Sequence, residues 1–229
     1  MTQADTLGSW KMAAVALLAI FGLVNAASAQ LALGLETNRT RYLKYEKVEA
    51  TVTIRNNSGN RLRFSRAAGG RLTFHLRTPG NVTFRRFDKT GLLDGLVLNP
   101  GQAKQLSFAI NTKIPMHDTG EYELYVQVGH ARLPRDTRSA RKSIRIKDGT
   151  VTWQRHIGIP VEEDAEEKIP QRKVSIVVLQ GDGPDYYCLK IEDDRYIYRI
   201  VRLGKRIFGS RIQCEIDSFS KIHVLQRAK

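Results

Sequence analysis

The strongest constraint on the fold is the stretch from Asp118 to Gly129, in which a turn is followed by strictly alternating side chains. Apolar or aromatic residues occupy every second position, namely Tyr122, Leu124, Val126 and Val128. The residues between them are Glu121, Glu123, Tyr125 and Gln127. Successive side chains of a β-strand point to opposite faces, so the pattern predicts a strand with one buried and one solvated face. Such strands are typical of antiparallel sheets.

Similar short segments precede and follow this strand. We expect further strands over residues 31–37, 48–55, 61–65, 71–77, 82–87, 106–110 and 143–147. Turn-forming residues separate several of them, for example in the Asn-rich stretch 56–60 and at Asn99-Pro100-Gly101. Short strands with regular turn signals indicate an all-β sandwich, which we place at residues 30–149.

The turn before the alternating strand also resembles a known motif. Asp118, Gly120 and Tyr122 fit the pattern Asp-x-Gly-x-Tyr, which resembles the tyrosine corner at the start of strand F in immunoglobulin-like sandwiches. The resemblance implies that the Tyr122 hydroxyl bonds back to upstream backbone, with Asp118 in the same structural corner.

A second resemblance lies nearer the N-terminus. Four residues match the Tyr-Leu-Pro-Gly-Glu-x-Val pattern of macroglobulin-type immunoglobulin-like domains of exported bacterial proteins, namely Tyr42, Leu43, Glu46 and Val48. Lys44 and Tyr45 replace the Pro-Gly pair, so we expect the tight turn to differ here. The resemblance covers about residues 31–149 and implies a fold, because one such fold carries many activities.

The first 29 residues are typical of a secretory signal peptide. Lys11 precedes an apolar run from Met12 to Val24, and Ala27-Ser28-Ala29 provides small residues for cleavage before Gln30. The apolar run is shorter than the roughly 20 residues that span a bilayer. We therefore expect an exported protein, periplasmic or extracellular, with no membrane span in the mature chain.

The positive charge is concentrated in the first domain. Residues 31–148 hold 22 Lys and Arg against 10 Asp and Glu, whereas residues 149–229 hold 14 against 12. The residues that we expect to bind a polyanion are Arg61, Arg63, Arg71, Arg77, Arg85, Arg86, Arg138, Arg141 and Lys142. The partner is then an unknown protein or an anionic component of the envelope or matrix, and a merely solubilising surface is the alternative. We do not expect nucleic acid, because few aromatic residues lie between the arginines.

Residues 150–173 form a predicted linker that contains Pro160, Pro170 and the acidic run 162–167. Whether this run docks on the basic domain is left open. Residues 174–229 predict a small antiparallel meander, with strands at 174–179, 186–192, 195–202, 212–216 and 222–226. Its closing Asp217 to Val224 weakly resembles a β-propeller blade motif in which Ser220 takes the place of a glycine.

Cys188 and Cys214 are the only two cysteines, and both fall within predicted strands. In an oxidising compartment we expect a disulfide between them, with two buried thiols as the alternative. Closing such a loop stabilises a thin core by about 3 kcal/mol on the chain-entropy model.

Nothing in the sequence defines a catalytic, cofactor or metal site. The five histidines do not occur at metal-ligand spacing, and no nucleophile elbow or phosphate-binding loop occurs. A cluster of acids could bind calcium through carboxylate oxygens, but turn formation explains it equally: Asp182, Asp185, Glu192, Asp193 and Asp194.

We therefore expect an exported, non-catalytic binding or structural module with a basic sandwich surface. One alternative is a proteinase inhibitor with the basic segment Ala131 to Ser139 as its reactive loop. The other is an enzyme of unrecognised type, because catalytic groups can come together from distant residues.

Overall fold

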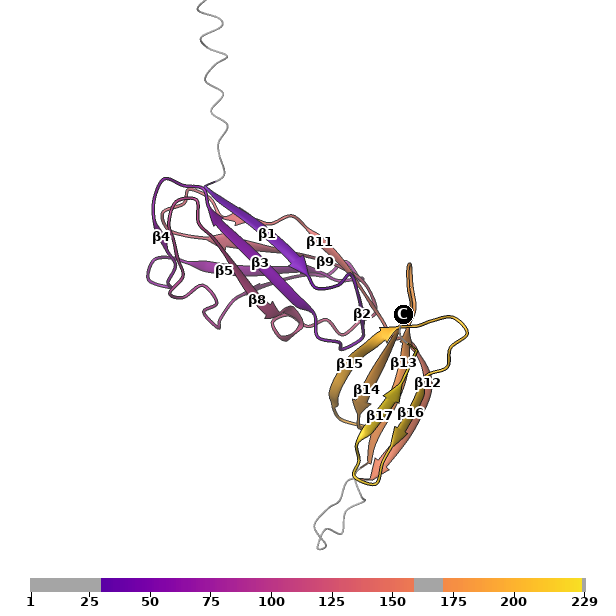
Figure 1. Cartoon of the computed structure of the whole chain (residues 1–229). Coiled ribbons are helices and arrows are strands. Elements are labelled where there is room, and N and C mark those ends of the chain that lie inside the picture. The colour runs from indigo at the N-terminus through magenta and orange to yellow at the C-terminus, as the bar shows by residue number, and fades with distance from the viewer. Residues whose placement is uncertain (1–29, 159–170, 228–229) are drawn as a thin grey trace, which may run out of the picture.

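The computed structural model describes residues 30–158 and 171–227, which form two all-β domains arranged end to end (Figure 1). The predicted all-β fold class is confirmed. The predicted signal peptide and the acidic run 162–167 lie outside the described residues.

The first domain consists of two main sheets. The three-stranded sheet has the order β1-β3-β8, with β1 (Leu31–Thr37), β3 (Glu49–Asn56) and β8 (Ala103–Ala109). The six-stranded sheet has the order β2-β11-β9-β5-β6, with β10 beside β9, and comprises β2 (Arg41–Leu43), β11 (Lys142–Lys147), β9 (Gly120–Gly129), β5 (Arg71–Arg77), β6 (Thr83–Phe87) and β10 (Thr137–Arg138). A short pair, β4 (Leu62–Arg63) with β7 (Val97–Leu98), and a 3-10 turn η1 (Ile110–Thr112) complete the domain.

One hydrophobic core fills the space between these sheets. The alternating positions of β9 that the sequence assigns to the interior are all buried, from Tyr122 to Val128. Opposite them, Ala50, Val52 and Ile54 of β3 enter the same core. The two inward faces therefore meet as the sequence pattern predicts.

Two buried tyrosines fix the chain where it enters the six-stranded sheet. The Tyr122 hydroxyl donates to the carbonyl of Asp118 at 2.8 Å and accepts from its N–H at 3.0 Å, which is the contact that the corner pattern predicts. Tyr42 makes an equivalent corner, because its hydroxyl lies 2.6 Å from Asn38 Oδ1 and accepts from the N–H of Arg39 at 3.0 Å. Each hydroxyl thus satisfies backbone or side-chain groups that the turn would otherwise leave unpaired.

The turn after β2 corrects one expectation. The N–H of Glu46 donates to the carbonyl of Leu43 at 2.8 Å, and Tyr45 has φ of 70°, so the chain keeps a tight turn although Lys44 and Tyr45 replace Pro-Gly. The left-handed region at the third position of a tight turn normally requires glycine or asparagine. Tyr45 therefore holds a strained backbone conformation.

We predict that Tyr45→Gly is more stable than Tyr45→Ala by about 1 kcal/mol, because both changes remove the ring but only glycine relieves the left-handed strain. Urea unfolding of the two variants measures the difference. Equal free energies of unfolding would show that the turn carries no strain.

The second domain begins earlier than the sequence suggests. Residues 150–158 form strand β12 (Thr150–Gly158), which pairs antiparallel with β13 (Gln171–Leu179). The predicted linker at residues 150–173 is therefore corrected at both ends, where its residues belong to a sheet. The four-stranded sheet continues through β14 (Tyr186–Glu192) and β15 (Ile197–Lys205), and a separate hairpin joins β16 (Gln213–Ile216) to β17 (Ile222–Leu225).

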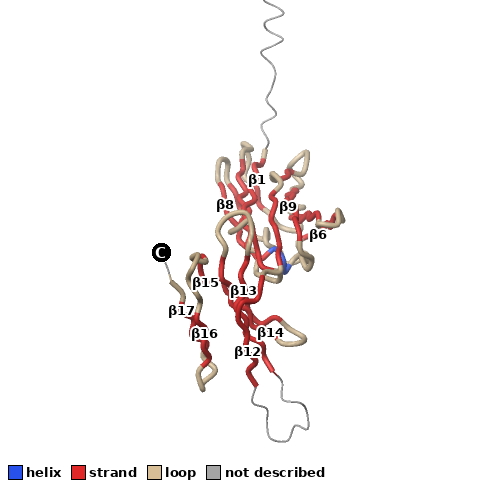
Figure 2. Tube along the Cα trace, turned by 90° about the vertical axis from the view of Figure 1, so that its right-hand side faces the viewer, coloured by secondary structure: helices blue, strands red, loops and turns tan. Residues whose placement is uncertain are grey.

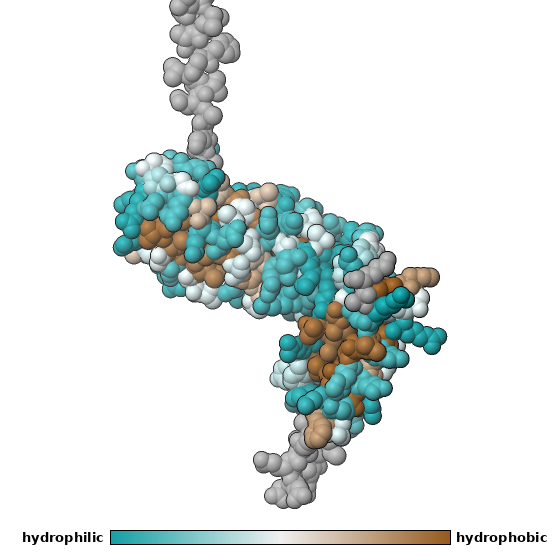
Figure 3. All heavy atoms as spheres, viewed as in Figure 1, coloured by the Kyte–Doolittle hydropathy of each residue, from teal (hydrophilic) through white to brown (hydrophobic). Residues whose placement is uncertain are grey.

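The two faces of this sheet contact different neighbours. On one face, Ile176, Val178 and Tyr187 pack with the β16–β17 hairpin, which contributes Cys214. On the other, Val177, Leu179 and Cys188 pack with Leu43 of the first domain. Figure 3 shows hydrophilic and apolar residues interspersed on the visible face of the first domain, and an apolar area on the second domain.

The positive φ of Ser220, 60°, places it in a glycine-like turn conformation between β16 and β17. Glycine adopts this conformation at no steric cost, whereas serine does so less readily. The Asp217 carboxylate supports the turn by accepting from the N–H groups of Phe219 and Lys221, both at 2.9 Å.

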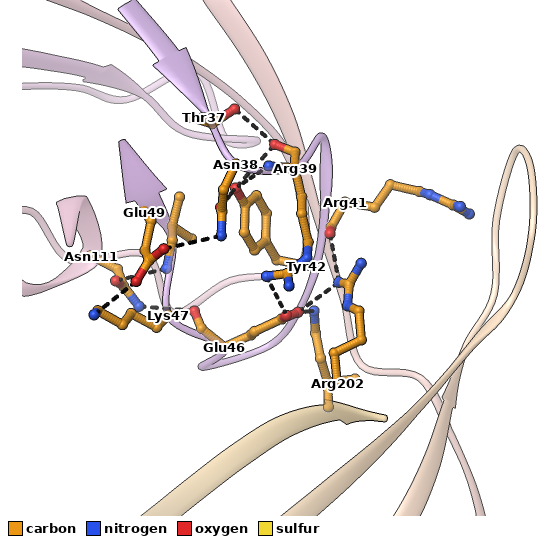
Figure 4. Close-up of polar contacts among 12 residues, drawn as sticks. Thr37, Asn38, Arg39, Arg41, Tyr42, Glu46, Lys47, Glu49, Asn111 and Arg202 are labelled. Carbon is orange, nitrogen blue, oxygen red and sulfur yellow. Dashed lines mark hydrogen bonds and ion pairs between the residues drawn. The ribbon is translucent and has the colours of Figure 1, made fainter. Parts of the chain in front are cut away.

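A buried ion pair joins the two domains (Figure 4). The Glu46 carboxylate accepts from Arg202 of β15 at 2.9 Å and from the N–H of Leu43 at 2.8 Å. The same guanidinium donates to the carbonyl of Arg41 at 2.9 Å and lies over the Tyr186 ring at 4.8 Å. Both side chains are nearly excluded from solvent, with exposures of 6% for Glu46 and 10% for Arg202.

We predict that Glu46→Gln lowers the free energy of unfolding by about 3 kcal/mol, since removing one partner leaves a buried charge uncompensated. The double variant Glu46→Gln with Arg202→Met should recover part of the loss, because it removes both charges. Urea unfolding followed by Trp153 fluorescence measures both effects in the second domain. Additive losses in the double variant would contradict a direct coupling.

Candidate functional site

The candidate site lies on the outer, solvent-facing side of the six-stranded sheet, across β6, β5, β9 and β10. His75 of β5 stands directly opposite Arg85 of β6 on one side and Tyr125 of β9 on the other. Directly opposed residues share a face of the sheet, with Cβ atoms about 5 Å apart. Arg138 of β10 pairs with the neighbouring Gln127 and so reaches the same face. We call His75, Arg85, Tyr125 and Arg138 the stacked row.

The rings and guanidinium groups of the stacked row lie close together. The His75 and Tyr125 rings are parallel within 10°, with their centroids 4.4 Å apart. The Arg138 guanidinium lies 4.7 Å from the Tyr125 centroid, and that of Arg85 lies 5.0 Å from the centroid of Phe87. Cation–π contacts of this kind hold an arginine in place while leaving its hydrogen-bond donors free.

His75 is an unusual member of this row because it is buried and one of its ring nitrogens lacks a partner. Its exposure is 7%, and its Nε2 atom has no hydrogen-bond partner among the described residues. Burial, followed by the positive charges of Arg85 and Arg138, lowers the pKa of His75 below its ordinary value of 6.5. The imidazole is therefore neutral at pH 7 and presents a polar atom that nothing in the described chain satisfies.

The row suits an anionic group. Among the residues that the structure describes, no carboxylate lies within ion-pair distance of Arg85 or Arg138, so both guanidinium groups are available for other partners. The planar fork of arginine matches carboxylate, sulfate and phosphate oxygens. An anion between them would also favour the protonated form of His75, since an opposite charge raises a histidine pKa.

We predict that His75 makes folding less favourable in acid. Its folded-state pKa is lowered, so below pH 6.5 the unfolded chain takes up a proton that the folded chain resists, and the free energy of unfolding falls. In His75→Gln the free energy of unfolding should fall less between pH 7.5 and pH 5.0 than in the wild type. The control variant His156→Gln, at an exposed position, should keep the wild-type fall. Urea unfolding at the two pH values makes the comparison, and an unchanged pH dependence in His75→Gln contradicts the assignment.

The nine predicted polyanion-binding residues are not brought together as one patch. Arg71 forms a two-pronged contact with Asp136, and Glu123 pairs with both Arg77 at 3.7 Å and Arg141 at 3.3 Å. The remaining members lie apart from the row, with Arg61 and Arg63 at β4, Arg86 directly opposite Phe74 on the core side of β6, and Lys142 at the start of β11. Only Arg85 and Arg138 of the predicted set belong to the stacked row.

Sequence reasoning missed His75 and Tyr125 as site residues. Each belongs to the polar half of an alternating strand, a signal that assigns them to the outer face. The two residues are fifty positions apart along the chain, and their contact depends on the register of β5 against β9.

The predicted disulfide is not formed. Both Cys188 and Cys214 are free and buried. Cys188 lies on the face of the sheet toward the first domain, whereas Cys214 lies under the hairpin on the opposite face. The sheet itself therefore separates the two sulfur atoms. Burial, with a smaller effect of Glu46, raises the pKa of Cys188 to about 11, so this thiol is protonated at neutral pH and weakly nucleophilic.

Four of the five acids considered as calcium ligands have other partners. Asp182 pairs with Arg145 at 2.7 Å, Asp185 with Arg206 at 3.6 Å, and Glu192 with Lys173 at 2.9 Å. Asp193 accepts from two backbone N–H groups of its own turn and from the Tyr198 hydroxyl. Within the described ranges, no group of three or more histidine, cysteine or acidic side chains is placed to hold a metal ion.

The segment proposed as an inhibitory loop is partly anchored. Thr137 and Arg138 form strand β10, and the hydroxyl of the buried Ser139 accepts from the N–H of Val126 at 3.0 Å. Asp136 is held by Arg71 and by Gln127. The free part of Ala131 to Ser139 is therefore shorter than the sequence suggests.

Comparison with known proteins gives weak likenesses. No family model and no curated protein matches the chain. Among solved structures, it is similar to the Pseudomonas fluorescens alkylpurine DNA glycosylase AlkC bound to DNA containing an abasic site analog, with 10% identity, a TM-score of 0.38, and coverage of 52% of this chain and 31% of that chain.

Two further structures match a larger share of the chain. The sporulation control protein Spo0M of Bacillus subtilis has 12% identity and a TM-score of 0.32, covering 76% of this chain and 89% of that one. The periplasmic chaperone SfaE has 13% identity and a TM-score of 0.28, covering 84% and 98%. Among the described residues, no helix is long and apolar enough to cross a membrane.

Proposed function

We propose that the protein is an exported, non-catalytic binding module whose six-stranded sheet presents the stacked row to an anionic group of an envelope or matrix partner. The single observation that supports this function is the placement of Arg85 and Arg138, which form no ion pair within the described residues, around the buried His75, whose Nε2 atom has no partner there. Export rests on the signal-like residues 1–29, with a periplasmic or extracellular location.

The first domain is best assigned to the immunoglobulin-like, macroglobulin-type sandwiches. Two observations support this assignment: the Tyr122 corner, and the parallel pairing of the short β2 with β11 at the edge of the sheet. Such sandwiches carry many unrelated functions, so the assignment adds no specific activity.

Binding of a polyanion should depend on the row rather than on net charge. We predict that Arg85→Gln with Arg138→Gln elutes from a heparin column at clearly lower salt than the wild type. Arg61→Gln with Arg63→Gln removes the same charge from β4 and should elute almost where the wild type does. Equal shifts in the two double variants would mean that heparin senses only the overall charge, which would contradict the proposed site.

A further inference from the structure

Strand β6 ends the six-stranded sheet and has a free edge (Figure 2). Within residues 30–158 and 171–227 its only neighbour is β5, and all five of its residues, Thr83–Phe87, are exposed. An unpaired edge presents a row of N–H and C=O groups that can pair with another extended chain.

The hydrogen-bond pattern shows which residues face this edge. The N–H of Thr78 donates to the carbonyl of Val82, and the N–H of Asp88 donates to the carbonyl of Leu72. In an antiparallel ladder every second residue bonds to the neighbouring strand, so residues 82, 84, 86 and 88 bond to β5. The N–H and C=O groups of Thr83, Arg85 and Phe87 therefore point outward.

The side chains along the edge define the chemistry of an added strand. Arg85 lies on the outer face, as part of the stacked row, and Arg86 lies on the face toward the core. Phe84, also on the core side and directly opposite Leu76, is 39% exposed, and the adjacent Val82 is 54% exposed. An incoming strand thus meets two adjacent arginines, one on each face, and an apolar rim of the core.

These charges disfavour pairing of β6 with a second copy of itself. In the antiparallel register centred on the middle of the edge, Arg85 would stand directly opposite Arg85 of the other copy. Like charges directly opposite one another are destabilising in a sheet. Acidic side chains at the same positions are favoured instead.

We propose that β6 binds an extended acidic peptide segment by strand addition, with acidic residues opposite Arg85 and Arg86 and an apolar residue opposite Phe84. This inference rests on the proposed function, because it identifies a polypeptide as the carrier of the anionic group. Main-chain hydrogen bonds to Thr83, Arg85 and Phe87 provide affinity, and the two arginines provide selectivity.

The test uses a fluorescein-labelled nonapeptide with two adjacent glutamates followed by alternating valine and threonine, titrated against the mature chain by fluorescence anisotropy. Thr83→Pro is the informative variant, because it removes an outward N–H that β5 does not use and keeps both arginines. We expect Thr83→Pro to weaken peptide binding about tenfold or more while heparin retention stays unchanged.

A second measurement leaves the protein intact. The same peptide with N-methyl groups at the positions that face β6 keeps its charges but cannot form the ladder. Its affinity for the wild-type protein should therefore be no higher than the affinity of the plain peptide for Thr83→Pro. Equal binding of the plain, N-methylated and scrambled peptides would overturn strand addition while leaving the anionic site in place.

Loss of heparin retention in Arg85→Gln with Arg138→Gln separately tests the proposed function. A concentration-dependent dimer that Thr83→Pro abolishes would also overturn the proposal, in favour of self-pairing.

Discussion

The register of β5 between β6 and β9 determines both the interior and the outer surface of the first domain. Leu76 stands between Phe84 and Leu124 on the core side, and one position away His75 stands between Arg85 and Tyr125 on the outside. Because side chains alternate, a shift of one residue would exchange the two faces and expose the core. The apolar packing that stabilises the sandwich therefore also holds the stacked row in place.

The arginines of this domain fall into two groups that differ in their contacts. Some arginines are neutralised by nearby acids, as Arg71 is by Asp136 and Arg145 by Asp182. Exposed pairs of this kind contribute little to stability, about 0 to 1 kcal/mol each. Arg85 and Arg138 instead contact aromatic rings, which positions them without using their donors. Net charge alone does not distinguish these two groups.

The sequence predicted the elements that depend on local periodicity. The buried face of β9, the inward residues of β3 and the Tyr122 corner all follow from side-chain alternation and turn residues. The start of the second domain could not be predicted in this way, because β12 is exposed along most of its length and a bulge between Val151 and Trp153 interrupts its alternation. The turn at Tyr45 was also misjudged, since the hydrogen bond from the Glu46 N–H to the Leu43 carbonyl closes a tight turn in which tyrosine takes a disfavoured conformation.

The stacked row could be predicted only in part, because alternation assigns residues to a face but does not give their neighbours across strands. The two cysteines show the same limit. Both occupy interior positions, yet an entire sheet lies between them, with Leu43 packed beside one and the β16–β17 hairpin beside the other. With both thiols free, the described strands of this domain are held together by ladder hydrogen bonds, apolar packing and ion pairs, none of which a reducing agent breaks.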